Sequence, residues 1–356
     1  MKNFIILMTL LLSLPALSQT RVQKKVAAKS NNFGVTYSLP KTSLIISAEV
    51  TKVSCKAGPY YRYAEKYLGI KDPITEDKVQ YQLGKIDIVN KGIPNTDETY
   101  IVEFRSGTVA PYVFLTEEGL LCTINADYTP PTQSGLELVR KGKTGPEKVA
   151  DVSVFSEELL MAGSTAKQAE VAAKEIYRIR ESRMNILTGE SDNVPPDGQA
   201  MKLVIEELEK KEKNLMNLFA GICTSETDYY DVTVVPTGDM EREVLFRFSD
   251  LLGIVSADDL GGVPVYMNLK TTERAAVLDP KEAEKKAKSM KGIIYNIPGK
   301  AVVQIIMNKK TLFEGEEPIV QFGSQEGLAT SMFEDKKAPV KVFFYPETGT
   351  IKQIIQ

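Results

Sequence analysis

The sequence predicts an α+β protein in which two β-rich, sandwich-like lobes flank an inserted antiparallel helical hairpin. Short β-branched and apolar runs, separated by Gly, Pro, Asn and Asp, fill residues 33–127 and 223–356 and indicate strands. Between them, residues 164–220 carry apolar side chains at helical spacing on both sides of one turn. The predicted segments are a signal peptide (1–18), a disordered leader (19–32), an N-terminal β-rich lobe (33–127), a linker (128–150), a helical hairpin (151–222) and a C-terminal β-rich lobe (223–356).

The composition restricts the chemistry available to the chain. Its 356 residues include 44 Lys and Arg, 47 Asp and Glu, and no His. Without His, the chain cannot form a Ser-His-Asp or Cys-His catalytic site or an HExxH zinc site. The net charge of −3 disfavours nucleic acid, because proteins that bind it carry a basic excess. We therefore predict no metal, no cofactor and no nucleic-acid partner.

The N-terminus is typical of a secretory signal peptide. Lys2 precedes the apolar run Phe4–Leu14, and the small residues Ala16 and Ser18 take the −3 and −1 positions of a cleavage site before Gln19. A membrane anchor is the alternative, but the run is shorter than the ~20 residues that a spanning helix needs. We therefore expect export with cleavage.

Residues that follow the cleavage site bear on location. The first cysteine is Cys55, so a lipid-anchored lipoprotein is not expected. Arg21, Lys24, Lys25 and Lys29 form a short basic stretch, which we interpret as a solvated leader; a membrane-surface patch is the alternative. The expected location is the periplasm, with the outer surface or secretion as alternatives. No transmembrane segment is predicted after signal cleavage.

The three cysteines, Cys55, Cys122 and Cys223, leave two interpretations open. In an oxidising compartment, two of them can form a disulfide while the third stays free. The spacings match no framework, however, and Cys122 lies in an apolar run that indicates a buried strand. We therefore favour three buried small hydrophobic residues. A catalytic thiolate would lack its usual His partner.

The N-terminal lobe is predicted to consist mostly of strands, with one helical interruption at Pro59–Leu68. There Tyr60, Tyr63, Ala64 and Tyr67 fall on one helical face. We expect this amphipathic helix to dock on a sheet, and a glycan-stacking platform is the alternative. The predicted strands are Ser43–Val53, Tyr81–Val89, Tyr100–Phe104, Tyr112–Leu115 and Leu120–Ile124.

The hairpin has the clearest helical pattern. Ser164 or Thr165 can cap the first helix, and the turn Thr188–Gly198 contains two Pro and an Asp-Gly pair. The short connection predicts that the two helices pack antiparallel, with their charged faces in solvent. Their apolar stripes are Ala169, Ala172, Ala173, Ile176, Ile179 and Ile186 on the first helix, and Met201, Val204, Ile205, Leu208, Leu215, Leu218 and Phe219 on the second.

The C-terminal lobe is again predicted to be strand-rich. Pro346–Gly349 is a turn signal, so the chain should end in a β-hairpin. Asp279–Lys291 is a polar insertion that is either helical or mobile. The predicted strands are Tyr230–Val235, Val244–Phe248, Val263–Leu269, Ile293–Ile297, Ala301–Met307, Ile319–Phe322, Val340–Tyr345 and Ile351–Ile355.

Carboxylates are the remaining candidates for catalysis, because a glycosidase needs two of them roughly 5–10 Å apart. Turns and caps account for Asp more readily than catalysis does, so we assign no catalytic residue. Ser256–Gly262 suggests calcium, but it lacks the ligand alternation and closing Glu of an EF-hand loop, and we interpret it as a capped turn. The acid clusters are Asp228 with Asp231, Asp258 with Asp259, and Glu316 with Glu317.

A ridge of charge on the first hairpin helix is the candidate binding surface. This charged ridge consists of Glu175, Arg178, Arg180, Glu181 and Arg183. Spacings of three residues place Glu175, Arg178 and Glu181 near one another, where they can bind an anion or a protein partner. The alternatives are surface ion pairs, each contributing under about 1 kcal/mol, or packing against a β lobe that would orient the hairpin.

Several stretches together resemble one protein family. With them the chain resembles, over nearly its whole mature length, the exported bacterial family of unknown function DUF4831. The resemblance implies export and a single full-length architecture, and it implies no activity, substrate or site residue. The stretches are Gly34–Thr42, Tyr63–Gly69, Thr108–Pro111, Ala162–Glu170, Glu175–Arg183, Asp192–Asn193, Asp197–Gly198, Leu245–Ser249, Ala257–Leu260, Pro298–Gly299, Gln321–Gly323 and Pro346–Gly349.

These observations predict a non-enzymatic binding or scaffolding module of the cell envelope, with another envelope protein as its partner. One alternative is a carboxylate-based glycan or peptidoglycan hydrolase, so whether the protein is an enzyme stays open. A second alternative is a periplasmic protein that binds a small ligand in a groove between the lobes. The oligomeric state and the packing of the lobes are not predicted.

Overall fold

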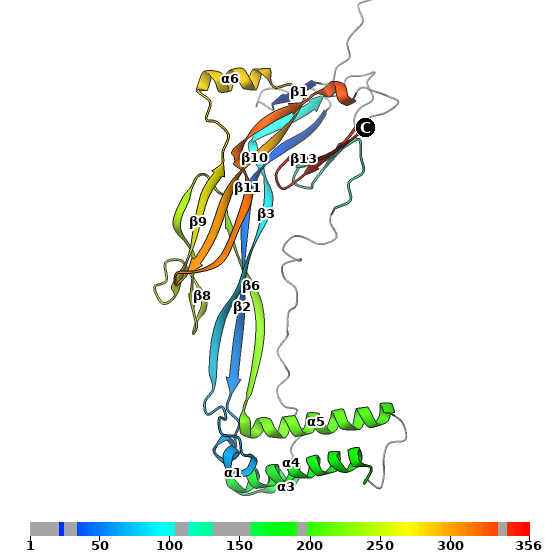
Figure 1. Cartoon of the computed structure of the whole chain (residues 1–356), viewed down its shortest axis with the longest axis vertical. Coiled ribbons are helices and arrows are strands. Elements are labelled where there is room, and N and C mark those ends of the chain that lie inside the picture. Colours follow the sequence, from blue (N-terminus) through cyan, green and yellow to red (C-terminus); the bar gives the residue numbers. More distant parts are fainter. Residues whose placement is uncertain (1–20, 25–33, 104–112, 131–156, 191–197, 334–339) are drawn as a thin grey trace, which may run out of the picture.

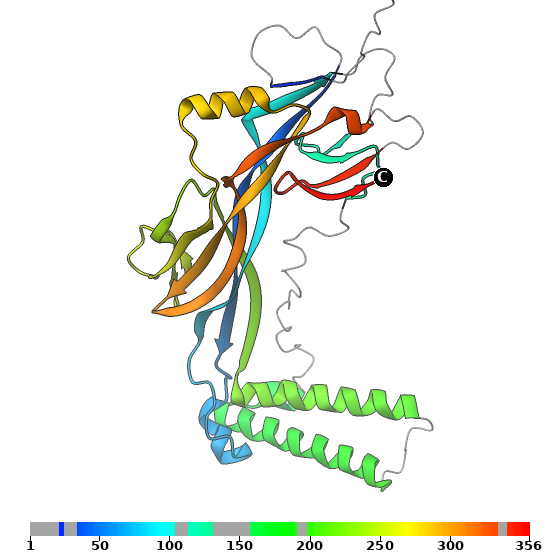
Figure 2. The same cartoon turned by 45° about the horizontal axis from the view of Figure 1, so that its top comes forward.

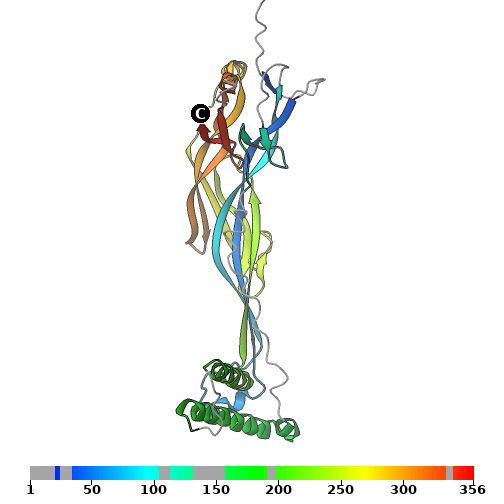
Figure 3. The ribbon, with the colours of Figure 1, turned by 90° about the vertical axis from the view of Figure 1, so that its right-hand side faces the viewer.

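The protein is an elongated α+β molecule (Figure 1). The structure is a computed structural model, and it describes residues 21–24, 34–103, 113–130, 157–190, 198–333 and 340–356. Three sheets form the body and one end, and a pair of long helices lies at the other end. The view in Figure 3 shows how narrow the molecule is beside its length. The predicted α+β class with a helical pair is confirmed.

Thirteen strands and a smaller set of helices make up the described residues. The strands are β1 (Arg21–Lys24), β2 (Gly34–Lys56), β3 (Lys78–Glu103), β4 (Val113–Leu115), β5 (Leu121–Ile124), β6 (Ile222–Val234), β7 (Met240–Ser249), β8 (Gly253–Val255), β9 (Val263–Glu273), β10 (Ile293–Met307), β11 (Lys310–Leu328), β12 (Lys341–Tyr345) and β13 (Thr350–Ile355). The helices are α1 (Ala64–Leu68), α3 (Glu157–Met161), α4 (Thr165–Thr188), α5 (Gly198–Ala220) and α6 (Pro280–Ser289), with 3-10 turns η1 (Tyr61–Tyr63) and η3 (Thr330–Phe333).

Two antiparallel sheets pack face to face as a sandwich. Their strand orders are β1-β3-β2-β6 and β11-β10-β9-β7-β8. Residues at alternate positions point inward, as the period of a strand requires. The core between the sheets is formed by Leu44, Ile46, Ala48 and Ile86 of the first sheet and Phe246, Phe248, Val265, Met267, Leu269, Ala301, Val303, Ile305, Ile319 and Phe322 of the second.

A third sheet, β13-β12-β5-β4, packs at the end of the sandwich that is remote from the long helices. Its core contains Tyr37, whose ring stacks on Tyr100 with centroids 5.7 Å apart. The Tyr37 hydroxyl donates to the Ile294 carbonyl at 3.2 Å and accepts from the Ile294 amide at 2.9 Å. Burial raises the pKa of Tyr37, so the phenol stays neutral and links the first two sheets.

Strands from distant parts of the sequence are interleaved in these sheets. β6 pairs with β2, and β12 pairs with β5. β1, within the predicted leader, pairs with β3, so four leader residues form a strand instead of a disordered segment. The final hairpin of β12 and β13 is confirmed, and its turn ends at Gly349 with φ of 69°. Residues 131–156, which hold most of the predicted linker, lie outside the described residues.

β2 and β3 are longer than the predicted strands, with 23 and 26 residues. Breaker residues that suggested strand ends are accommodated inside the sheet. The pairing shifts register between Ser38 and Pro40, and again between Ala48 and Val50. At Gly92, an added Cβ would lie 2.5 Å from the Pro346 carbonyl oxygen, so this glycine permits close approach of the terminal turn. The breakers therefore mark bulges and a close contact, not turns.

Three strands continue beyond the sandwich as a stalk. The stalk consists of residues 51–56 of β2, 78–80 of β3 and 222–228 of β6. None of these residues is buried, so this part of the sheet has no second layer. At ~3.3 Å per residue, β2 spans roughly 75 Å. The stalk therefore separates the sandwich from the helical end.

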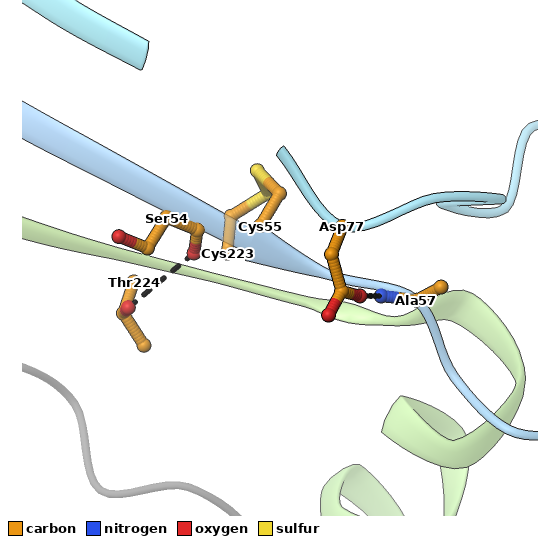
Figure 4. The surroundings of a disulfide bond; sticks show 6 residues. All are labelled: Ser54, Cys55, Ala57, Asp77, Cys223 and Thr224. Atoms are coloured by element: carbon orange, nitrogen blue, oxygen red, sulfur yellow. Dashed lines mark hydrogen bonds between the residues drawn. A yellow bond between two sulfur atoms is a disulfide. The ribbon is translucent and has the colours of Figure 1, made fainter. Parts of the chain in front are cut away.

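A disulfide joins Cys55 to Cys223 at the end of the stalk, as Figure 4 shows. The two residues are directly opposed on β2 and β6. Beside them, the Ala57 amide donates to Asp77 Oδ1 at 2.9 Å. The favoured interpretation of three buried hydrophobic cysteines is wrong for this pair. The spacing of cysteines along the sequence does not show which residues of two strands lie opposite each other.

Cys122, in contrast, is the buried small residue that the sequence predicts. It is completely buried in β5, and burial raises the pKa of its thiol to about 11. A thiol with this pKa is protonated at neutral pH and is a poor nucleophile. Its role is therefore packing.

The predicted helix at Pro59–Leu68 is present as η1 and α1, but it docks on helices and not on a sheet. Tyr60 is buried against Phe219, with ring centroids 5.5 Å apart. The Tyr60 amide donates to the Leu218 carbonyl at 2.8 Å. Sequence periodicity identified the apolar face correctly, but it carries no information on which element covers that face.

Replacing Cys55 and Cys223 together by Ser should lower the free energy of unfolding by about 2–4 kcal/mol, because the disulfide crosslinks positions 168 residues apart in a stalk without a core. Thermal unfolding followed by circular dichroism measures this as a lower Tm. Reductant is the matched control: it should lower the Tm of the wild type and leave the double variant unchanged. Equal Tm values in all four samples would contradict a stabilising disulfide.

Candidate functional site

The helical hairpin of α4 and α5 is the first candidate site, and it projects sideways from the end of the stalk (Figure 2). The Ser164 hydroxyl oxygen caps α4 by accepting from the Lys167 amide at 3.3 Å. Gly189, with φ of 77°, ends the helix in the left-handed conformation. The predicted cap and antiparallel pairing are confirmed, while residues 191–197 of the turn lie outside the described residues.

The base of the hairpin, next to the stalk, has a core of its own. The buried side chains of this core come mostly from the two predicted apolar stripes, with others from α3 and from the segment of η1 and α1. Ile186, at the other end of the α4 stripe, is only half buried. The packing therefore weakens toward the tip. The buried residues are Tyr60, Ala64, Leu159, Ala169, Val171, Ala172, Ala173, Ile176, Ile179, Leu215, Leu218 and Phe219.

Glu212 of α5 is a buried carboxylate between the two helices, with 8% of its surface exposed. Arg180 Nε lies 2.6 Å from Glu212 Oε1, and Arg183 Nη1 lies 2.8 Å from Glu212 Oε2. Arg180 also contacts the Met216 sulfur at 3.4 Å and lies over the Tyr177 ring. One carboxylate thus holds two guanidinium groups of the neighbouring helix.

This cluster divides the charged ridge in two. Arg180 and Arg183 face α5 and fix the pairing of the helices, whereas Arg178 and Glu181 are exposed and Glu175 is partly exposed. Arg178 pairs with Glu175 at 2.9 Å on the surface, a contact that contributes under about 1 kcal/mol. The ridge as a binding surface stays a prediction, now confined to its exposed members.

Sequence reasoning missed Glu212, although a signal for it exists. It follows Leu208 by four residues and precedes Leu215 by three, so it occupies a position in the apolar stripe. A charge in such a position must find a partner on the facing helix. The facing helix offers Arg at two suitable positions.

Four apolar side chains at the tip of the hairpin are exposed. Met184, Leu187 and Leu203 have 60%, 61% and 61% of their surface exposed, and Val204 has 37%. They come from the last turns of α4 and the first turns of α5. We call these four residues the distal patch. Single exposed apolar residues are ordinary, whereas several toward one end of a hairpin make that end a candidate interaction surface.

A second candidate is a cavity of about 760 Å³ beneath α6, at the opposite end of the molecule. The predicted insertion at 279–291 is helical here, and Asp279 caps it by accepting from the Glu282 amide at 2.8 Å. Lys41 and Lys286 are the two basic residues in the cavity wall. Its other lining residues include Leu39, Glu98, Ala283, Ala287, Met290, Asn296, Val320, Gln321, Ser324 and Gln325.

The candidate acids lie on three different elements. Asp231 on β6 accepts from the Ser47 hydroxyl at 2.8 Å. Asp259 accepts from the Gly261 amide at 2.8 Å, as the predicted capped turn requires. Glu317 on β11 accepts from the Asn90 side chain at 2.8 Å. In the described ranges, no group of three or more Asp, Glu or Cys residues is arranged to hold a metal ion.

Comparisons with known proteins identify a family but no function. The model of a family described as "domain of unknown function (DUF4831)" matches residues 33–352. No curated protein matches the chain, and no solved structure matches it. A search of the described helices for one long and apolar enough to cross a membrane finds none.

Glu212→Gln should lower the free energy of unfolding by about 1–3 kcal/mol, because it leaves two guanidinium groups without their carboxylate. Thermal unfolding of the full chain measures the change. Glu206→Gln is the matched control, since Glu206 on the same helix is exposed and pairs only with Lys202, at 3.7 Å, in the described structure. An equal effect of the two substitutions would contradict a structural role for Glu212.

Glu317→Gln should stabilise the protein more at pH 7 than at pH 4. Burial raises the pKa of Glu317, and the Asn90 hydrogen bond lowers it by less. A carboxyl whose pKa is higher in the folded than in the unfolded protein has no effect of this kind on stability while it is protonated in both states. As the pH rises from the ordinary pKa of about 4.3 through the raised pKa, the carboxyl ionises more readily in the unfolded protein, so the folded protein loses stability relative to its value at low pH. Gln removes the charge and keeps an oxygen acceptor.

The measurement is the Tm difference between variant and wild type at the two pH values. Glu316→Gln serves as the control, because Glu316 is half exposed and lies 4.0 Å from Lys300. It should not reproduce the pattern. A Tm difference for Glu317→Gln that is the same at pH 4 and pH 7 would show that burial does not perturb this carboxyl.

Proposed function

Since the chain belongs to the DUF4831 family, a family of unknown function, we propose from its own geometry that it is a non-enzymatic binding or scaffolding module of the cell envelope. In this proposal the stalk holds a partner-binding hairpin away from the sandwich. The observation that carries it is the distal patch, which leaves apolar side chains in solvent at the most remote part of the hairpin.

Two features support export to the envelope. The segment from Lys2 to Ser18 has the charge, the apolar run and the small residues of a signal peptide. The disulfide between Cys55 and Cys223 is of a kind that persists in oxidising compartments and is rare in the cytosol. The periplasm combines both requirements, and it is the location we propose.

The form of the hairpin supports a protein partner. Its base is already packed against α1, so the distal patch is not needed to fold the helices. Met184, Leu187 and Leu203 can each bury an aliphatic side chain, which contributes ~1.5–3 kcal/mol when burial is complete. The exposed Arg178 and the partly exposed Glu175 of the charged ridge would form part of the polar rim. The partner is therefore an envelope protein with an apolar groove or helix.

Among the alternatives, small-ligand binding has a specific observation in its favour, namely the cavity beneath α6. The hydrolase has less in its favour, because tyrosines of the predicted helix pack against the hairpin core and the candidate acids lie in separate parts of the chain. We therefore keep ligand binding as the second candidate function.

A photocrosslinking side chain at Leu203 should capture one envelope protein in intact cells, in near-stoichiometric yield, because the distal patch would lie inside the interface. Affinity purification of the tagged protein and mass spectrometry identify the adduct. The matched position is Val277, an exposed apolar residue near α6 at the other end of the molecule. It should capture nothing reproducible.

With the partner identified, Met184→Asp and Leu203→Asp, made in the chain without the photocrosslinker, should each raise the Kd of the purified complex tenfold or more, because a charge would enter an apolar contact. Both side chains are exposed, so the Tm should stay within a degree or two of the wild type. Leu251→Asp, at another exposed apolar position, is the control. An unchanged Kd in both Met184→Asp and Leu203→Asp, or the same adduct from Val277, would overturn the hairpin as the interface.

A further inference from the structure

The cavity beneath α6 is bounded by parts of the chain that differ in rigidity. Its floor is formed by β2, β10 and β11, where Gln321 joins two sheets. Gln321 Oε1 accepts from the Thr42 amide at 2.9 Å, and its Nε2 donates to the Thr42 carbonyl at 2.8 Å. The Asn296 side chain donates to the carbonyls of Pro40 and Thr348. The side-chain amides of Gln321 and Asn296 are thus hydrogen-bonded to the backbone of neighbouring segments, which holds the floor of the cavity in place.

The roof of the cavity is α6, and none of its residues is buried. Ala283, Lys286 and Ala287 of α6 line the cavity at i, i+3 and i+4, on one helical face, together with Met290, which follows the helix. The helix is stabilised locally by its Asp279 cap and by an ion pair within its own length. A helix whose small apolar face lies over open space can close on a ligand without displacing other side chains. In Figure 2 it lies across the end of the molecule opposite the hairpin.

The charges in the wall are unbalanced. Lys41 on the floor and Lys286 on the roof are both half buried, and neither forms an ion pair with a described residue. The single carboxylate in the wall, Glu98, accepts a hydrogen bond from the Tyr100 hydroxyl at 2.6 Å. Two lysines that line one cavity without a paired carboxylate favour an anion there, and partial burial strengthens that attraction over its value in water.

We propose that this cavity binds an organic anion, namely a carboxylate or phosphate on an aliphatic body, and that α6 closes over it. The anionic group would lie between Lys41 and Lys286. The aliphatic body would pack on Ala283, Ala287 and Met290. A cavity of about 760 Å³ has the size of a small-molecule site. This inference does not rest on the hairpin, because the two sites are at opposite ends of the molecule.

Isothermal titration of the mature protein with decanoate tests the proposal, with decanol as the probe that has the same body and no charge. Decanoate should bind saturably at one site, and decanol at least tenfold more weakly. Inorganic phosphate supplies the charge without the body and should bind weakly. Equal affinities for decanoate and decanol, or no saturable binding of decanoate, would overturn the anion site.

Variants locate the binding. Lys41→Met and Lys286→Met should each weaken decanoate about tenfold, the value expected for one charge-assisted contact. Lys285→Met, one residue away on α6 and outside the cavity wall, should leave the affinity unchanged. Ala283→Glu should abolish binding while the exposed helix stays folded. Unchanged affinity in Lys41→Met and Lys286→Met would overturn the assignment.

Hydrogen exchange tests the closing of α6. Decanoate should slow amide exchange in residues 280–289, and exchange in α4 should not change. Binding without slower exchange in α6 would overturn its role as a lid and leave an open site. The titration is repeated with Leu203→Asp to test whether decanoate binding depends on the hairpin. This variant should bind decanoate with wild-type affinity.

Discussion

The backbone pairing of β2 with β3 on one side and β6 on the other is the constraint on which the rest of the structure depends. In the sandwich this ribbon is covered by a second sheet, and apolar burial stabilises it. In the stalk it has no cover, so only ladder hydrogen bonds, cross-strand contacts such as Thr51 with Thr227, and the disulfide hold it together. Placing Cys55 opposite Cys223 secures the register where burial cannot.

The same strand that reaches the hairpin also forms the floor of the cavity. Thr42, near the other end of β2, is bracketed by the Gln321 side chain, and its hydroxyl accepts from the Val320 amide at 2.9 Å. This joint aligns the two sheets of the sandwich. One face of the cavity is therefore as rigid as the core, while α6 is attached only at its ends. A rigid wall opposite an unpacked helix is an arrangement in which a ligand can supply the missing contacts.

Elements set by local pattern could be predicted from the sequence, while features set by strand register could not. The caps, stripes and antiparallel pairing of α4 and α5 follow from spacing alone. The pairing of β2 with β6 joins residues far apart in the chain, so neither the disulfide nor the stalk could be read from one sequence. Gly92 looked like a strand end, yet its lack of a Cβ serves a contact with the terminal turn. The sequence places the charged ridge on α4, but it does not show that Arg180 and Arg183 turn toward Glu212. The burial of Glu212 depends on how α4 and α5 pack together, which one sequence does not show.

The ion pairs inside the hairpin set the register of α4 against α5. Beyond α1 and α3, the two helices have only each other as partners in the described structure, so a single helix–helix seam must fix their register. A buried carboxylate with two guanidinium partners specifies that register more sharply than aliphatic side chains can, at some expense in stability. Leu203 precedes Glu212 by nine residues, which places it on the face of α5 away from this seam, and Met184 is likewise exposed toward the tip. A hairpin whose register is set by its own ion pairs can therefore fold without covering these apolar side chains.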